Sequence, residues 1–188
     1  MTKISIIGAG YVGLVTGVGL ALKGHDIICV EKIREKVEQI KKGESTIYEK
    51  DLDKLLSDLI GNKFEITTDF EYAIKNSDIT IVCVGTYPQQ DGRIDLSQIK
   101  DASKVLGDNL KSKDSYHTIV VKSTVVPTTT RNVVMPLLEL YSGKKCGIDF
   151  GLCANPEFLR EGHAIEDFIK PDRIVIGEFD EKSGSILE

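Results

Sequence analysis

The sequence predicts a doubly wound α/β fold, in which a mostly parallel sheet carries helices on both faces. Short apolar runs alternate with helical patterns along the 188 residues, as is typical of repeated strand–helix–strand units. The first apolar run passes directly into a glycine-punctuated turn, behind which a helical pattern begins. An acidic residue closes the second apolar run. Together these features predict a sheet that binds a dinucleotide at its first turn.

The first turn carries glycines at the spacing G-x-G-x-x-G of Rossmann-type folds. Gly8 lets the chain reverse after the strand, Gly10 lets the backbone approach a pyrophosphate, and Gly13 lets the helix pack closely on the strand. The helix then directs its N-terminal N–H groups and the positive end of its dipole at the phosphates. The spacing is weak evidence by itself, and the strand before it and the helix after it strengthen it.

Glu31 closes the apolar run 27–30, about 20 residues after the glycines, where a ribose-binding carboxylate is expected. Such a carboxylate accepts hydrogen bonds from the ribose of NAD and repels the 2′-phosphate of NADP. The structural alternative is a solvated acid at a strand end. Lys32, Arg34 and Lys36 follow and partly offset the repulsion, so NADP is disfavoured and not excluded.

The remaining elements follow from periodicity and from turn residues. Gly24 and Gly43 stop the first two helices, Asp69 caps a later one, and Pro136 kinks or breaks the last. Gly17 and Gly19 mark close packing of the first helix on the sheet. We expect strands at 4–7, 27–30, 64–67, 79–84, 116–121, 150–154 and 173–177. We expect helices at 12–23, 33–42, 52–59, after 69, from 95 or 97 to about 110, and from 127–128 to about 140.

Composition narrows the classes of function. A net charge of −5 gives no reason to expect binding to nucleic acid or to an anionic membrane. No apolar run is long enough to span a bilayer and no cleavable signal is present, so we expect a soluble, cytoplasmic protein of one domain. The cysteines sit in or beside apolar runs without metal-ligand spacing, which predicts buried, reduced thiols and no metal site. No histidine has a partner set for base or metal chemistry. These cysteines and histidines are Cys29, Cys83, Cys146, Cys153, His25, His117 and His163.

Two threonines follow strands in the predicted sheet. Thr86 comes after Gly85 at the end of the strand 79–84, and Thr124 follows the strand 116–121. Ligands of doubly wound sheets sit beyond the carboxyl ends of strands, so both side chains are placed to touch a bound cofactor. For Gly85-Thr86 a plain turn is an equally good interpretation.

These motifs together resemble the UDP-glucose/GDP-mannose dehydrogenase family, specifically its N-terminal NAD-binding domain, over nearly the whole chain. The stretch 155–162, Asn-Pro-Glu-Phe-Leu-Arg-Glu-Gly, is the most specific and looks more like the UDP-glucose branch than the branches that oxidise N-acetylated sugars. GDP-mannose enzymes share much of it. The other matching stretches are 8–14, 43–49, 84–86 and 122–125.

The resemblance implies NAD-dependent oxidation of the C6 alcohol of a nucleotide sugar to a carboxylate through two hydride transfers. The expected substrate is UDP-glucose and the expected product is UDP-glucuronate, with GDP-mannose as the alternative substrate. It implies that Thr124 and Glu161 place the catalytic water and protons. NAD would contact Gly8, Gly10, Tyr11, Val12, Gly13, Glu31, Lys36, Thr86, Thr124 and Glu161. The sugar nucleotide would contact Glu157, Phe158, Leu159, Arg160 and Glu161, partly through their backbone. The structural alternative makes Glu157 and Glu161 solvated acids on one helical turn.

The chain departs from the family pattern in several places. Glu31 stands where aspartate is more frequent, Tyr87 separates Thr86 from Pro88, and Lys50-Asp51 replaces a Pro-Gly pair and leaves that loop less constrained. The family's second oxidation passes through a cysteine thioester in a C-terminal domain, and no cysteine here has an activated context. We therefore expect residues 1–188 to form the NAD-binding domain without the central helix and C-terminal substrate domain, binding NAD without full turnover.

Family members imply homodimers whose contacts come largely from that central helix, so we expect a monomer here. Two other classes stay open. One is a non-catalytic module that senses NAD or a nucleotide sugar. The other is a methyltransferase, which also places glycines after a first strand and an acid after a second, although the stretch 155–162 argues against it.

Overall fold

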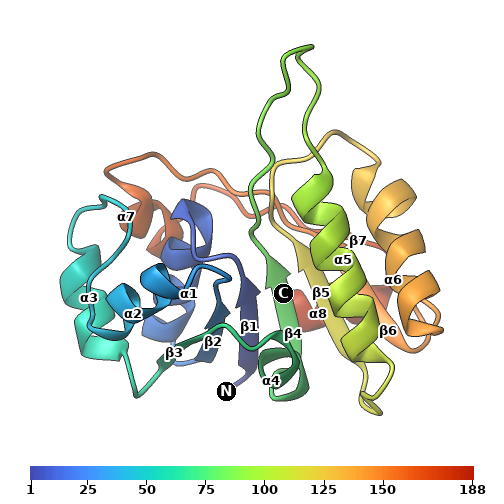
Figure 1. The fold of residues 1–188 in the computed structure, drawn as a ribbon, viewed down its shortest axis with the longest axis horizontal. Coiled ribbons are helices and arrows are strands. Elements are labelled where there is room, and N and C mark those ends of the chain that lie inside the picture. The colour runs from blue at the N-terminus through green and yellow to red at the C-terminus, as the bar shows by residue number, and fades with distance from the viewer.

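A seven-stranded sheet forms the centre of the molecule, and the computed structural model describes all residues 1–188 (Figure 1). The strand order is β3-β2-β1-β4-β5-β6-β7, and the first six strands run parallel while β7 pairs antiparallel with β6. The order reverses between β1 and β4, which makes their carboxyl ends the switch point where such sheets bind ligands. The strands are β1 Lys3–Ile7, β2 Asp26–Val30, β3 Phe64–Thr67, β4 Ile79–Val82, β5 His117–Val121, β6 Phe150–Ala154 and β7 Gly177–Glu178.

Helices cover both faces of this sheet, so the predicted fold class is confirmed. One hydrophobic cluster joins α1, α2 and α3 to one face, and a second joins α4, α5 and α6 to the other. In Figure 1, α4, α5 and α6 lie in front of the strands, while α8 lies behind them. The helices are α1 Tyr11–Leu22, α2 Arg34–Lys41, α3 Leu52–Leu59, α4 Phe70–Lys75, α5 Ser97–Leu110, α6 Met135–Ser142, α7 Ala164–Ile169 and α8 Glu181–Leu187.

Local signals placed most element boundaries correctly. Gly24 and Gly43 take the positive φ angles of +96° and +80° that end a helix in the left-handed region. The Asp69 carboxylate accepts a hydrogen bond of 2.9 Å from the Tyr72 N–H, as a helix cap does. Pro136 lacks the N–H that an α-helix needs, and the turn Thr130–Val134 before it widens to a π-helix.

The predicted last strand at 173–177 is wrong. Only Gly177–Glu178 pairs with β6, and residues 173–176 have no regular structure. Ile174 and Val175 are 68% and 43% exposed, so their β-branched pattern meets no packing surface in this chain. The strand predicted at 79–84 ends at Val82, and α7 and α8 were not predicted.

The two glycines within α1 serve different contacts. A Cβ at Gly17 would come within 2.6 Å of the Phe64 ring and 3.1 Å of Ile6 on the sheet, as predicted. A Cβ at Gly19 would instead overlap the ring of Phe168, which belongs to α7. Gly19 therefore allows helix–helix contact, and the prediction that it packs on the sheet is wrong.

All four cysteines are buried free thiols, as predicted. Burial raises the pKa of Cys83 and of Cys146 to about 12, so neither is a thiolate near neutral pH. No helix in the structure combines the length and the apolar character needed to cross a membrane.

Candidate functional site

The turn between β1 and α1 requires glycine at two positions. Gly8 has a φ of +103°, and a Cβ there would lie 2.7 Å from the Cys83 carbonyl oxygen. A Cβ at Gly13 would overlap the Gly8 carbonyl oxygen, so larger residues would push α1 away from the turn. These contacts bring the turn against the end of β4, at the switch point of the sheet.

Gly10 faces open space, because nothing lies within 4 Å of the position its Cβ would take. It is the N-cap residue of α1, provides no side-chain cap, and the first turn of α1 holds no acid. The N–H groups of that turn and the dipole of α1 are thus available to an anion. Val12 is the second residue of α1 and half-buried against the core.

Glu31 lies at the end of β2, beside this turn, with only 8% of its surface exposed. One carboxylate oxygen accepts a hydrogen bond from the Ile33 N–H at 3.0 Å, and the other lies 3.4 Å from the Ala9 N–H. An uncapped helix start and a fixed carboxylate one strand away match the diphosphate and a ribose of a dinucleotide. The residues present therefore fit such a coenzyme. Lys36, half-buried on α2, follows five residues later.

Thr86 and Thr124 come together although 38 residues separate them. The Thr86 hydroxyl donates to the Thr124 carbonyl at 2.6 Å, and the Ser123 hydroxyl donates to the Val84 carbonyl at 2.7 Å. These bonds join the loops after β4 and β5. Both threonines lie at the edge of the sheet that also carries the glycine turn.

A buried lysine at this edge escaped the sequence prediction of site residues. Lys122 is 7% exposed, and its ammonium donates to the Asn155 side-chain oxygen at 2.9 Å. Burial lowers the pKa of Lys122, and the nearby Glu157 carboxylate opposes this effect. The Asn155 amide in turn donates to the Val175 carbonyl at 2.8 Å, which ties three segments together. The position of Lys122 at the end of an apolar run was the one feature of the sequence that could have indicated a buried lysine at this edge.

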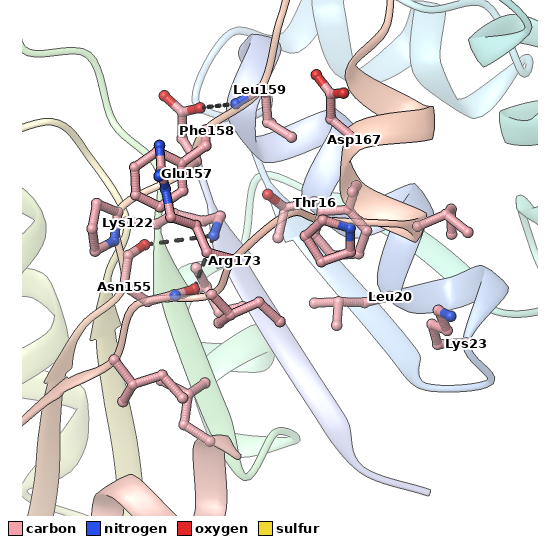
Figure 2. Close-up of a pocket in the computed structure, with 18 of the residues that line it drawn as sticks. Thr16, Leu20, Lys23, Lys122, Asn155, Glu157, Phe158, Leu159, Asp167 and Arg173 are labelled. Atoms are coloured by element: carbon pink, nitrogen blue, oxygen red, sulfur yellow. Dashed lines mark hydrogen bonds between the residues drawn. The ribbon is translucent and has the colours of Figure 1, made fainter.

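The segment 155–160 forms an irregular loop, so Glu157 and Glu161 do not share a helical turn. The Glu157 carboxylate accepts from the Leu159 N–H at 2.7 Å, and the Arg173 guanidinium lies 4.7 Å from the centre of the Phe158 ring. Glu161 is exposed. Figure 2 shows the side chains of 157–159 above the Lys122–Asn155 pair.

Arg160 is held by a partner that the sequence did not indicate. Two nitrogens of its guanidinium donate hydrogen bonds to the Asp167 carboxylate, at 2.6 and 3.1 Å. Its backbone N–H donates to the same carboxylate at 2.9 Å. These bonds hold the pKa of Asp167 at about 2. Two of the guanidinium nitrogens face Asp167, and the side chain is still 71% exposed, so its remaining N–H groups can reach an anion.

A groove of about 1010 Å³ runs beneath this loop, between α1 and the segment 155–176 (Figure 2). Ile4, Ile79 and Ile81 of the sheet line it, as do Lys122 and Asn155. The glycine turn does not line it. The groove and the glycine turn are therefore separate features, and the loop 155–160 lies beside both, since it lines the groove and its Arg160 carbonyl lies 3.4 Å from the Tyr11 hydroxyl.

Known proteins resemble this chain in sequence and in fold. The model of the NAD-binding domain of the UDP-glucose/GDP-mannose dehydrogenase family matches residues 2–188. A GDP-mannose 6-dehydrogenase of Pseudomonas syringae pv. tomato is 46% identical over 187 residues, which is 99% of this chain and 43% of the relative. A UDP-glucose 6-dehydrogenase of Rhizobium meliloti is 42% identical over 177 residues, 93% of this chain and 39% of the relative.

Solved structures agree with these relatives. A ternary complex of GDP-mannose dehydrogenase from Pseudomonas aeruginosa superposes with a TM-score of 0.96 at 44% identity, over 98% of this chain and 43% of that one. A UDP-glucose dehydrogenase from Pyrobaculum islandicum superposes with a TM-score of 0.93 at 40% identity, over 100% of this chain and 43% of that one. The chain thus spans about two fifths of the length of the proteins it matches.

Proposed function

Since this chain belongs to the UDP-glucose/GDP-mannose dehydrogenase family, whose NAD-binding domain it matches over residues 2–188, we propose that it holds NAD for oxidation of the C6 alcohol of a nucleotide sugar to a carboxylate. One observation carries the proposal: the open, uncapped start of α1 at Gly10 lies beside the buried carboxylate of Glu31. That pairing offers N–H groups to a diphosphate and an acceptor to the adjacent ribose.

The proposal gives the remaining residues of this edge defined roles. Thr86 and Thr124, which their hydrogen bond holds together, would contact the nicotinamide end of NAD, and the bound coenzyme would supply the hydride acceptor for C6. Lys36 and Glu161 add contacts to the coenzyme. The carboxylate of Glu161, exposed and close to the turn, orients water together with Thr124 and takes up protons. The backbone of Gly8, Gly10, Tyr11, Val12 and Gly13 would hold the diphosphate.

The loop 157–161 forms the nucleotide-sugar side of the site in this proposal. Arg160 can direct its free N–H groups at a substrate phosphate while Asp167 fixes the other edge of its guanidinium. Glu157, Phe158 and Leu159 line the same side, where the Glu157–Leu159 hydrogen bond fixes the course of the loop.

Two nucleotide sugars are candidates. The stretch 155–162 favours UDP-glucose, and two GDP-mannose 6-dehydrogenases at 46% identity favour GDP-mannose. The identities of 46% and 42% differ too little to choose between them. We also propose that residues 1–188 act as the coenzyme domain, and that full turnover needs a C-terminal substrate domain in addition.

Calorimetry with the 188-residue chain tests the coenzyme assignment. Wild type should bind NAD more tightly than NADP. Glu31→Ala should weaken NAD binding by about 1.5–3 kcal/mol and narrow the preference over NADP, because the ribose loses a charged acceptor. The exposed Glu35→Ala, on the first turn of α2, is the matched control and should bind as wild type does. Unchanged NAD affinity in Glu31→Ala would show that the ribose lies elsewhere.

A second experiment tests the reaction. The C-terminal domain of a family member is added, and NADH formation is followed by absorbance with UDP-glucose and with GDP-mannose. The nucleotide sugar with the higher kcat/KM is the substrate. If NAD binds and neither sugar is oxidised, the alternative of a non-catalytic binding module is favoured.

A further inference from the structure

We propose that Glu49 and Tyr11 are positioning residues that hold Glu161 at the coenzyme turn, so that the segment 160–164 responds when NAD binds. The inference rests on the proposed function, because it concerns how the site for NAD is assembled. Neither side chain is proposed to touch the reacting atoms. They act through the backbone on either side of Glu161.

Glu49 is a buried carboxylate with three donors from two distant parts of the chain. It is 6% exposed, lies in the loop before α3, and accepts a hydrogen bond from the Tyr11 hydroxyl. It also accepts from the Gly162 N–H at 2.8 Å and from the Ala164 N–H at 3.1 Å. An isolated buried carboxylate is costly, so these three charge-assisted bonds fix the geometry strongly.

Tyr11 connects this carboxylate to the glycine turn. It is the first residue of α1 and follows Gly10 directly, so its backbone N–H belongs to the proposed diphosphate site. Burial of the hydroxyl and the Glu49 carboxylate raise the pKa of Tyr11, which keeps it a proton donor across the physiological range. The same hydroxyl lies 3.4 Å from the Arg160 carbonyl oxygen.

The consequence concerns Glu161, which stands between the two groups that are held. The Arg160 carbonyl before it faces the Tyr11 hydroxyl, and the Gly162 N–H after it donates to Glu49. Gly162 turns the chain with a φ of +84°. The backbone at Glu161 is therefore fixed from both sides while its own side chain stays exposed. A small shift of Tyr11 on NAD binding would be transmitted to this residue.

The helix α7 has an apolar contact to α1 besides these bonds, because the ring of Phe168 lies against α1 at Gly19. Glu49 also binds the first residue of α7 through the Ala164 N–H, so the polar bonds fix the start of this helix together with the 160–164 backbone. A purely structural role would predict loss of stability without any change in the response to NAD.

The test is an NMR titration of the 188-residue chain with NAD, following the amide resonances of Gly10, Gly13, Gly162 and Ala164. In wild type all four should shift. In Tyr11→Phe, which removes only the hydroxyl, the shifts of Gly10 and Gly13 should persist, while those of Gly162 and Ala164 fall to less than half. Glu49→Gln, in which a side-chain amide faces the N–H groups of Gly162 and Ala164, should reduce the shifts of these two resonances in the same way.

The matched control is Tyr72→Phe, whose hydroxyl donates to the Glu65 carboxylate at 3.1 Å on another part of the molecule. It should leave all four shifts as in wild type. Wild type without any shift at Gly10 would refute the proposed function. Two results would overturn this inference alone, and in both the Gly10 resonance shifts in wild type. In the first, Gly162 and Ala164 shift equally in wild type and in both variants. In the second, Gly162 and Ala164 do not shift in wild type.

Discussion

His117 should make the protein sensitive to mild acid. It begins β5, is completely buried, and one ring nitrogen lies 2.7 Å from the Thr80 hydroxyl, which pairs with the Ser5 hydroxyl at 2.6 Å. The other ring nitrogen has no partner. Burial, together with the charge of Lys113, lowers the pKa of His117 to about 3. The folded protein thus keeps this imidazole neutral where an unfolded chain protonates it.

The sign and size of the effect follow from linkage. An unfolded histidine has a pKa of 6.5, so below that pH the unfolded chain binds a proton that the folded chain refuses until about pH 3. The contribution to stability is complete above 6.5 and is lost as the pH falls, at about 1.4 kcal/mol per pH unit. Between pH 6.5 and 4.5 the free energy of unfolding should fall by about 2–3 kcal/mol from this residue.

Urea unfolding at a series of pH values measures this loss. His117→Asn should be less stable than wild type at pH 7.5 and should lose less stability on acidification, because its side chain does not titrate. The matched control His163→Gln removes an exposed imidazole and should keep the wild-type slope. NMR of the wild-type imidazole adds a direct measurement. A wild-type His117 ring that titrates near pH 6.5, or equal slopes in wild type and His117→Asn, would refute the reasoning.

Three further changes have defined outcomes. Asp51 has a φ of +62°, so Asp51→Gly should relieve left-handed strain and raise the free energy of unfolding in urea by about 0.5–1 kcal/mol; a loss would contradict this. Gly19→Ala should lower it by about 1–3 kcal/mol, because the new Cβ overlaps the Phe168 ring, and an unchanged value would show that α7 yields freely. Asp167→Asn should weaken nucleotide-sugar binding in calorimetry and spare NAD, because the change weakens the bonds that hold the guanidinium and the backbone N–H of Arg160. Equal losses for both ligands would argue against that role.

The sheet edge that carries the glycine turn could be predicted because its signals are local. The glycines at 8, 10 and 13 and the acid at 31 each follow a recognisable strand, and the parallel order of β1, β2 and β4 brings them together. The two threonines followed from the same rule about carboxyl ends of strands. Their mutual hydrogen bond did not, since the Thr124 carbonyl carries no signal in the sequence.

The segment after β6 shows where such reasoning stops. Residues 173–177 have the composition of a strand, yet whether they pair depends on the edge that β6 offers and on the bond from Asn155 to Val175. Intrinsic strand preference is weak compared with such tertiary contacts. For the same reason Asp167 gave no indication that it would hold Arg160.

By itself, the sequence determined the alternation of strands and helices, the sheet class and the position of the glycine turn, because these depend on neighbours within a few residues. Only the tertiary structure decided that Lys122 meets Asn155 and that Glu49 joins the glycine turn to a backbone more than 100 residues further on. Buried polar groups need partners, and the partner of each is chosen by which segments the packed sheet brings side by side.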